Sequence, residues 1–335
     1  MRRVDFPLGL VTSIGSLPHR SPEEAVRFVL EHQPELPAAP TIPAASPIEG
    51  MLPQAGWGIS GVTVRPDGSL AVDHSALDPN ASLADPALAG PPFETYRVFL
   101  RAVAGRTEPV KVQLSGPVTL GMALQAHGVR CDLAFAVAAR AVHQRAEHLL
   151  GLAGREAPGV PLVVFVDEPG LVAGLHSESP LAPDATIDLV SGALAALEPH
   201  AITGLHCCGP ADWRAVLEAG PQVLSLPLDA GIQTAAGPLA TFLDRGGWIA
   251  WGAVPTDGPL GDRASGLWRR LSTLWCELVQ SGCDPAALRR QALITPACGL
   301  STHGQAQAGR VLGLTREIGE RLHDQLLGVR LSVGA

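Results

Sequence analysis

Short apolar runs rich in β-branched residues recur along this 335-residue chain, separated by stretches with helical patterns. Most of the runs are apolar without interruption, which is typical of parallel strands covered by helices on both faces. The predicted strands are Leu10–Leu17, Ala39–Pro43, Val110–Ser115, Leu162–Asp167, Ile202–Cys207, Val223–Leu228, Trp248–Ala253 and Leu293–Ala297. Regular alternation of strand and helix predicts an α/β fold, a single (β/α)8 TIM barrel that spans residues 1–335.

Helix signals fill the gaps between these runs. Ser21 is a good N-cap, and Pro22 suits the first position of a helix, so a helix is predicted to begin there. The predicted helices are Pro22–His32, Leu133–Leu152, Asp184–Leu197, Ala211–Ala219, Leu239–Arg245, Leu260–Val279 and His303–Leu326. Gly61–His74 has two alternating runs around a Pro-Asp-Gly-Ser turn and predicts a β-hairpin inserted after the second strand. That hairpin could cover the barrel mouth or be a surface feature.

Composition excludes several classes of partner. The formal net charge is −8, and the arginines are scattered, which argues against a nucleic-acid partner and against a polybasic membrane anchor. No apolar stretch approaches the roughly eighteen residues of a membrane span, and the first residues lack the cleavage site of a signal peptide. We therefore expect a cytoplasmic protein. Its six cysteines are then expected to bind metal or to be inert, rather than to form disulfides.

Reactive side chains in barrels of this type lie at the carboxyl ends of the strands. The predicted strands that end near His206 and Cys298 would bring one imidazole and two or three thiols to a common rim. Residues i and i+2 of an extended segment point the same way, so His206 and Cys208 can face one ion while Cys207 faces elsewhere. Two thiolates and an imidazole favour zinc with an open position for a substrate. The alternative is that the cysteines are buried apolar residues and the histidine a hydrogen-bonded core residue.

Five motifs in matching order make the chain resemble the catalytic C-terminal barrel of cobalamin-independent methionine synthase, in the uroporphyrinogen decarboxylase and methionine synthase superfamily, in a short single-barrel form. They are Thr12–Pro18 (TSIGSLP), Lys111–Pro117 (KVQLSGP), Val166–Leu171 (VDEPGL), the His206-x-Cys208 pair and Pro296–Leu300 (PACGL). The resemblance implies zinc ligation by His206, Cys208 and Cys298 and a homocysteine-like thiol substrate. It also implies that Ile14, Gly15 and Ser16 contact the carboxylate of that substrate, and that Asp167, with Glu168 beside it, receives the ammonium group. A salt-bridged Asp167–Glu168 pair that only braces the strand end is the structural alternative.

The chain departs from the family pattern in three places. The family has a fourth zinc ligand, a Glu after the sixth strand, where this chain has Pro227; Asp229 is our candidate for that role. The family also has a proton-shuttling His after the seventh strand, which is absent here, so His303 or His19 is the candidate substitute. The second, N-terminal barrel of the family is missing as well, so the methyl donor could be methylcobalamin on a corrinoid protein or methyl-folate.

Together these features predict a zinc-dependent thiol S-methyltransferase of methionine biosynthesis, with Asp167 and His303 as the catalytic side chains. One alternative is a non-catalytic zinc- and thiol-binding relative, or a partner of a corrinoid protein. A second is a decarboxylase of the uroporphyrinogen type, which would need several cationic side chains at the mouth. A Schiff-base aldolase would depend on Lys111, the only lysine, which is predicted to lie at the start of a strand, away from the catalytic face.

Overall fold

The computed structural model describes residues 5–174, 181–258, 260 and 263–333. Its centre is a curled sheet of six parallel strands, hydrogen-bonded in sequence order. The strands are β3 (Val110–Ser115), β4 (Leu162–Asp167), β5 (Ile202–His206), β6 (Val223–Pro227), β7 (Trp248–Val254) and β8 (Ala292–Pro296). These strands are buried along almost their whole length, as their continuous apolar sequences predict. Six of the eight predicted strands are therefore present.

The first two predicted strands are wrong as regular strands. Residues Leu10–Leu17 and Ala39–Pro43 run beside the sheet but pair only through isolated bridges, Val11 with Ile294, Ser16 with Thr41, and Ala38 with Lys111. Each bridge has one pair of backbone hydrogen bonds, such as Thr12 N–H to Ile294 O at 3.1 Å with Ile294 N–H to Leu10 O at 3.0 Å. Prolines at positions 37, 40 and 43 lack the N–H that a continuous ladder needs, so the second segment cannot pair regularly.

Two short antiparallel strands lie in the segment that predicts a hairpin. They are β1 (Val62–Val64) and β2 (Leu70–Val72), and Val62 pairs with Val72 across the turn. The turn is closed by Gly68 N–H, which donates to Arg65 O at 2.9 Å, and Gly68 has a φ of +81°, which favours glycine.

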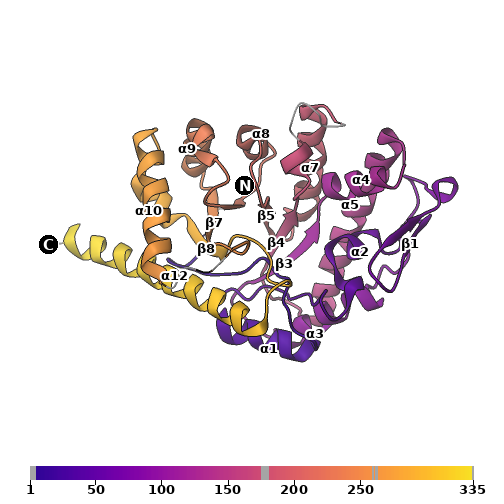
Figure 1. The fold of residues 1–335 in the computed structure, drawn as a ribbon, viewed down its shortest axis with the longest axis horizontal. Coiled ribbons are helices and arrows are strands. Elements are labelled where there is room, and N and C mark those ends of the chain that lie inside the picture. The colour runs from indigo at the N-terminus through magenta and orange to yellow at the C-terminus, as the bar shows by residue number, and fades with distance from the viewer. Residues whose placement is uncertain (1–4, 175–180, 259, 261–262, 334–335) are drawn as a thin grey trace.

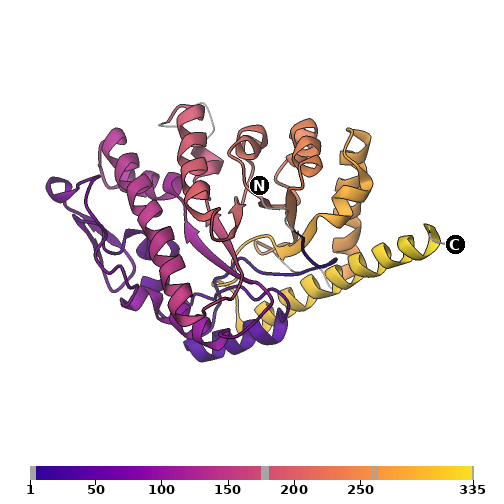
Figure 2. The same ribbon diagram turned by 180° about the vertical axis from the view of Figure 1, so that it is seen from behind.

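Helices surround the curled sheet (Figures 1 and 2). In Figure 1, α4, α5 and α7 to α10 stand around the outside of the sheet, whereas α1, α3 and α12 lie together below it. The helices are α1 (Pro22–His32), α2 (Met51–Gly56), α3 (Glu94–Ala102), α4 (Pro117–Ala126), α5 (Cys131–Glu156), α6 (Leu171–Gly174), α7 (Pro183–Leu197), α8 (Trp213–Glu218), α9 (Ala236–Asp244), α10 (Ala264–Gln280), α11 (Pro285–Arg290) and α12 (Gln305–Val333). In the part of the chain that the structure describes, no helix is long and apolar enough to cross a membrane.

Strand register sets the position of the site. Ser115 at the end of β3 pairs with Asp167 at the end of β4, and Asp167 pairs with His206 at the end of β5. His206 in turn pairs with Ser225 of β6. The polar ends of neighbouring parallel strands therefore lie at one level, and the sheet presents them together at its carboxyl edge.

Candidate functional site

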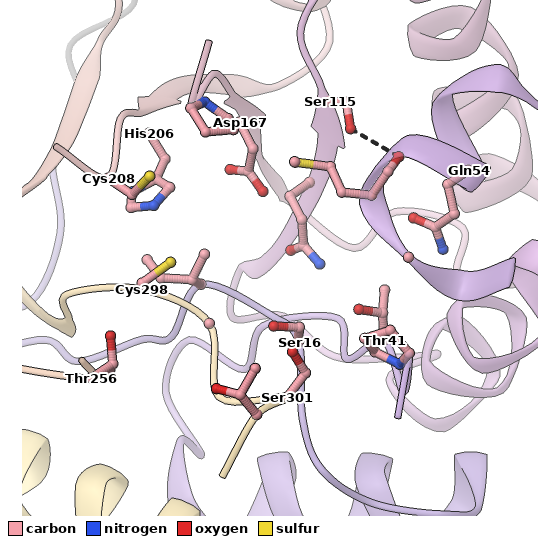
Figure 3. Close-up of a pocket in the computed structure, with 18 of the residues that line it drawn as sticks. Ser16, Thr41, Gln54, Ser115, Asp167, His206, Cys208, Thr256, Cys298 and Ser301 are labelled. Carbon is pink, nitrogen blue, oxygen red and sulfur yellow. Dashed lines mark hydrogen bonds between the residues drawn. The ribbon is translucent and has the colours of Figure 1, made fainter. Parts of the chain in front are cut away.

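A cavity of about 660 Å³ opens at the carboxyl edge of the sheet (Figure 3). Six of the side chains that the sequence predicts for the site line this cavity, although they come from four distant parts of the chain. They are Ile14, Ser16, Asp167, His206, Cys208 and Cys298. A volume of this size accommodates a small-molecule substrate. The structure therefore brings six of the residues predicted at strand ends to one cavity.

Two thiols and an imidazole share one wall of the cavity. Figure 3 shows Cys208 and His206 close together, with Cys298 facing them. The Cys298 thiol donates a hydrogen bond to the Cys208 sulfur, which lowers the pKa of Cys208 and raises the pKa of Cys298 to about 12. The pair therefore loses its first proton more readily than its second, because the negative charge of the first thiolate opposes the second deprotonation. A bound divalent cation would offset that charge.

Cys207 behaves differently from its neighbour. Its side chain is fully buried, its thiol lies 3.6 Å from Gly209 O, and burial raises its pKa to about 11. The alternation along an extended segment thus separates a buried cysteine from one that faces the cavity.

Only one of the two ring nitrogens of His206 has a hydrogen-bond partner. Its Nδ1 lies 3.0 Å from the Ser225 hydroxyl on β6, whereas its Nε2 is buried and has no hydrogen-bond partner. A metal-binding histidine is usually oriented by a hydrogen bond at the ring nitrogen that does not bind the metal. The sequence analysis missed Ser225, and the pairing of His206 with Ser225 across neighbouring strands is the feature that identifies it.

The donor set of this wall fits a soft divalent cation. Two thiols and a free imidazole nitrogen are the ligands that zinc prefers, and three such ligands leave a position open. Among the described residues, no three His, Cys, Asp or Glu side chains are already arranged as a metal-holding group. The fit therefore rests on the chemistry of the three donors and on the orphaned His206 Nε2, not on a completed coordination geometry.

Asp167 is half-buried, with a buried Oδ1 atom, and lines the same cavity. Its Oδ1 has no hydrogen-bond partner, and burial raises its pKa, against the opposing effect of the Lys111 ammonium. An unpaired carboxylate in this position suits an ammonium group supplied by a ligand.

Lys111, the second residue of β3, extends its side chain to residues that line the cavity. Its ammonium donates to Ile14 O at 2.8 Å and to Gln113 Oε1 at 3.2 Å, and both Ile14 and Gln113 line the cavity. Burial lowers the pKa of Lys111, and Asp167 opposes that shift. Lys111 lies near the start of β3, as predicted, and does not line the cavity, but its side chain supports two residues that do. Lys111, Gln113 and Ser115 alternate along β3, and this period-two pattern of polar residues is the sequence signal for a shared interior face.

The segment around Gly15 fits closely against β3. A side chain at Gly15 would meet Gln113 Nε2 at 2.3 Å, and Gly15 has a φ of +139°. Gly15 does not itself line the cavity, while its neighbours Ile14 and Ser16 do. Gly15 thus shapes the turn that presents the two residues to the cavity.

Glu168 has a structural role in the fold. Its carboxyl group is fully buried and accepts hydrogen bonds from Val118 N–H at 2.8 Å, Thr119 N–H at 2.7 Å and the Thr119 hydroxyl at 2.5 Å. These donors belong to the first turn of α4, so Glu168 joins the end of β4 to that helix. Burial raises the pKa of Glu168 to about 7. Glu168 does not line the main cavity, and among the described residues no ion pair is found for Asp167 or for Glu168.

Two further predicted residues lie outside the main cavity. Asp229 is exposed, lies 4.0 Å from Arg270, and lines a smaller cavity of about 240 Å³ that also contacts Cys208 and Cys298. His303 lies 3.4 Å from the Thr302 hydroxyl, and Thr302, not His303, lines the main cavity. The alternative shuttle, His19, is buried against the Phe28 ring, and burial lowers its pKa. The structure therefore leaves the fourth ligand and the proton acceptor as predictions.

The cavity wall carries few charges. Among the described residues that line it, there is no arginine or lysine, and Asp167 and Asp257 are the only acidic ones. A substrate with several carboxylates would have no cationic partner there, which disfavours the decarboxylase alternative.

The comparisons with known proteins identify the fold. No family model matches the chain, and no curated protein matches its sequence. Solved structures do match, and two of them align with this chain over nearly its whole length. A methyltransferase from Methanosarcina mazei is 16% identical, with a TM-score of 0.53, and the match covers 95% of this chain and 94% of that chain. A candidate vitamin-B12-independent methionine synthase from Listeria monocytogenes is 12% identical, with a TM-score of 0.58 and coverage of 91% and 85%. Identities this low show a shared fold.

Proposed function

We propose that this chain is a zinc-dependent methyltransferase whose acceptor is a small, homocysteine-like thiol. The observation that carries the proposal is the wall formed by Cys208, Cys298 and the unpartnered Nε2 of His206. The two solved structures of the same fold are named as a methyltransferase and a candidate methionine synthase, which supports methyl transfer as the general chemistry.

The three donors of the wall would hold the zinc. His206 is oriented by Ser225, so its Nε2 is available without rearrangement of the imidazole ring. Bound zinc would stabilise the deprotonated acceptor thiol, which is the nucleophilic form. Asp229 remains the candidate for a fourth ligand, and it would have to leave Arg270 and turn toward the thiol pair.

The acceptor would be held in the same cavity, by residues that lie beside the wall of thiols and imidazole. Asp167 would receive its ammonium group, because its Oδ1 is buried and unpartnered. Ile14 and Ser16 would contact its carboxylate, at a turn fixed by Gly15 and by the Lys111 hydrogen bond to Ile14 O. Holding the amino acid at both ends would direct its sulfur toward the thiol wall.

Methyl transfer forms a bond between the acceptor sulfur and the methyl carbon, and the donor leaves with the electron pair of its own bond to that carbon. The donor would be methylcobalamin on a corrinoid protein or methyl-folate. His303 would take up the thiol proton. Its Nδ1 lies 3.4 Å from the hydroxyl group of Thr302, which lines the cavity.

Metal analysis tests the zinc wall. We expect the purified protein to contain one zinc per chain, and we expect Cys298→Ser to lose most of it. Cys276→Ser is the matched control, because Cys276 is exposed on α10, away from the site. Wild-type protein free of zinc, or a Cys298→Ser variant with unchanged zinc, would overturn the metal assignment.

Turnover separates the enzyme from a non-catalytic relative. Homocysteine with methylcobalamin or with methyl-folate should give methionine, at a rate that a chelator abolishes and added zinc restores. Stoichiometric zinc without thioether formation from either donor would instead support a zinc- and thiol-binding protein without catalysis.

A further inference from the structure

A second group of unpaired polar atoms lies behind the main cavity, and nothing in the proposed function uses it. Arg145 of α5 is 4% exposed, and its Nη2 donates to Trp57 O. Its Nε and Nη1 are buried and have no hydrogen-bond partner. The guanidinium lies 4.9 Å from the centre of the Phe93 ring, which satisfies one face of the group but none of its N–H donors.

Among the described residues, no carboxylate contacts the Arg145 guanidinium as an ion pair. Asp85 is its electrostatic neighbour, but no ion pair joins the two. Both oxygens of Asp85 are already occupied, by Ala89 N–H at 2.7 Å, by Gly90 N–H at 2.8 Å and by the Trp57 indole N–H at 3.1 Å. Burial lowers the pKa of Arg145 to about 10, so the group is still protonated at neutral pH. Asp85 attracts the guanidinium without contacting it, so two buried N–H donors of a charged group still lack a partner, which favours an anion in direct contact.

Tyr96 of α3 adds a third free donor. Its side chain is 4% exposed, and its hydroxyl has no hydrogen-bond partner. Burial raises the pKa of Tyr96 well above its usual value, so the hydroxyl keeps its proton. Arg145 and Tyr96 both line a cavity of about 20 Å³.

The position and volume of this cavity limit the kinds of ligand that it can hold. Gln54, Gln113 and Ser115 line both this cavity and the main one, so the two are neighbours across one wall (Figure 3 labels Gln54 and Ser115). A volume of about 20 Å³ holds one water-sized particle. A substrate carboxylate with its carbon stem would not fit, whereas a monatomic anion would.

We propose that Arg145 and Tyr96 form a binding site for a single small inorganic anion of chloride size. Arg145 would donate from Nε and Nη1, and Tyr96 from its hydroxyl, so the three orphaned donors would be satisfied by one ligand. The anion would also neutralise the guanidinium, which a water molecule cannot do. The bound anion would fix α3 and α5 behind the β3 wall of the substrate cavity.

Bromide identifies the ligand directly, because it replaces chloride and scatters anomalously. Crystals of the wild-type protein soaked in bromide should show an anomalous peak between Arg145 and Tyr96. Crystals of Tyr96→Phe should show a weaker peak there, and crystals of Arg145→Met none. A wild-type map with no peak and only water density at this position would overturn the proposal.

Thermal denaturation in chloride and in gluconate at equal ionic strength gives an independent measurement. Gluconate is too large for the cavity, so wild-type protein should melt at a higher temperature in chloride. Tyr96→Phe, which loses one donor and keeps the charge, should need several-fold more chloride for the same gain. Phe135→Leu, a packing change on α5 whose side chain lines neither cavity, should keep the wild-type response. Equal melting temperatures of the wild-type protein in the two salts would contradict the proposal, even if Arg145→Met did not fold.

Discussion

At the scale of single residues, Asp167 and Glu168 show that two adjacent residues at a strand end can have different roles. The two acidic residues are adjacent, and alternation along an extended chain sends their side chains to different sides. Asp167 faces the cavity and lacks a partner, whereas Glu168 binds the first turn of α4. The strand-end rule was therefore sufficient to predict Asp167. It could not separate Glu168 from it, because the role of Glu168 depends on α4, a helix that the sequence analysis did not predict.

Asp167→Asn tests the ammonium contact. The amide keeps the shape of the side chain but loses the negative charge, so we expect KM for homocysteine to rise roughly ten- to hundredfold, the usual range for a charged hydrogen bond. The matched measurement uses 4-mercaptobutyrate, which has no amino group and should show little change in KM. An equal loss for both thiols would mean that Asp167 acts on the fold or on the metal wall instead.

At the scale of elements, the sequence predicts a strand or helix correctly where its apolar pattern and its end residues are distinct. The prediction for α1 matches residue by residue, because its Ser21 cap and Pro22 are unambiguous. In contrast, α4 was missed because it is almost apolar all round, with Gly121 against Phe135, and so lacks an amphipathic pattern. The first two strands were overpredicted, because composition does not show that pairing is limited to isolated bridges.

Glu168→Gln tests the junction of β4 and α4 through pH. The pKa of Glu168 is raised from 4.5 to about 7 by burial, so the folded state binds its proton more tightly than the unfolded state does. The resulting stabilisation is complete below pH 4.5 and is lost as the pH rises through about 7. Its size is on the order of 3 kcal/mol. Urea denaturation between pH 4.5 and about 7 measures this effect, and the stability of Glu168→Gln should change much less with pH than that of the wild-type protein. The exposed control Glu277→Gln should follow the wild-type curve, and identical slopes in all three proteins would refute the assignment.

Gly15→Ala tests how tightly the first segment fits against β3. The added carbon would lie 2.3 Å from Gln113 Nε2 at a φ of +139°, so we expect a loss of about 1–3 kcal/mol in the free energy of unfolding. Gly220→Ala is the control, because Gly220 has a φ of +83° with no atom within 4 Å of the added carbon. The difference between the two variants measures the contact with Gln113. Equal losses would assign the whole effect to backbone conformation.

At the scale of the molecule, the parallel order of β3 to β8 could be predicted from alternation alone, whereas the arrangement beside them could not. Val11 bridges β8 and Ala38 bridges β3, so residues 10–17 and 38–41 fill the space between the two edge strands with a few hydrogen bonds. The candidate site lies across this boundary, because Cys298 follows β8 and Ser16 belongs to the loosely paired segment. Strand order was therefore enough to predict six residues that line the cavity, whereas their exact contacts depend on segments with no regular pattern.

Removal of the metal tests whether the site also stabilises the whole molecule. Zinc bound by His206 and Cys208 after β5 and by Cys298 after β8 would join the two halves of the sheet, and binding to the folded state alone adds stability. At a free zinc concentration about 100 times Kd, the gain is about 2.7 kcal/mol, which corresponds to a rise in Tm of several degrees for a domain of this size. Differential scanning calorimetry of zinc-loaded and chelator-treated protein measures this shift. Cys276→Ser should keep it and Cys298→Ser should lose it. A shift that persists in Cys298→Ser would show that zinc stabilises the chain at some other place.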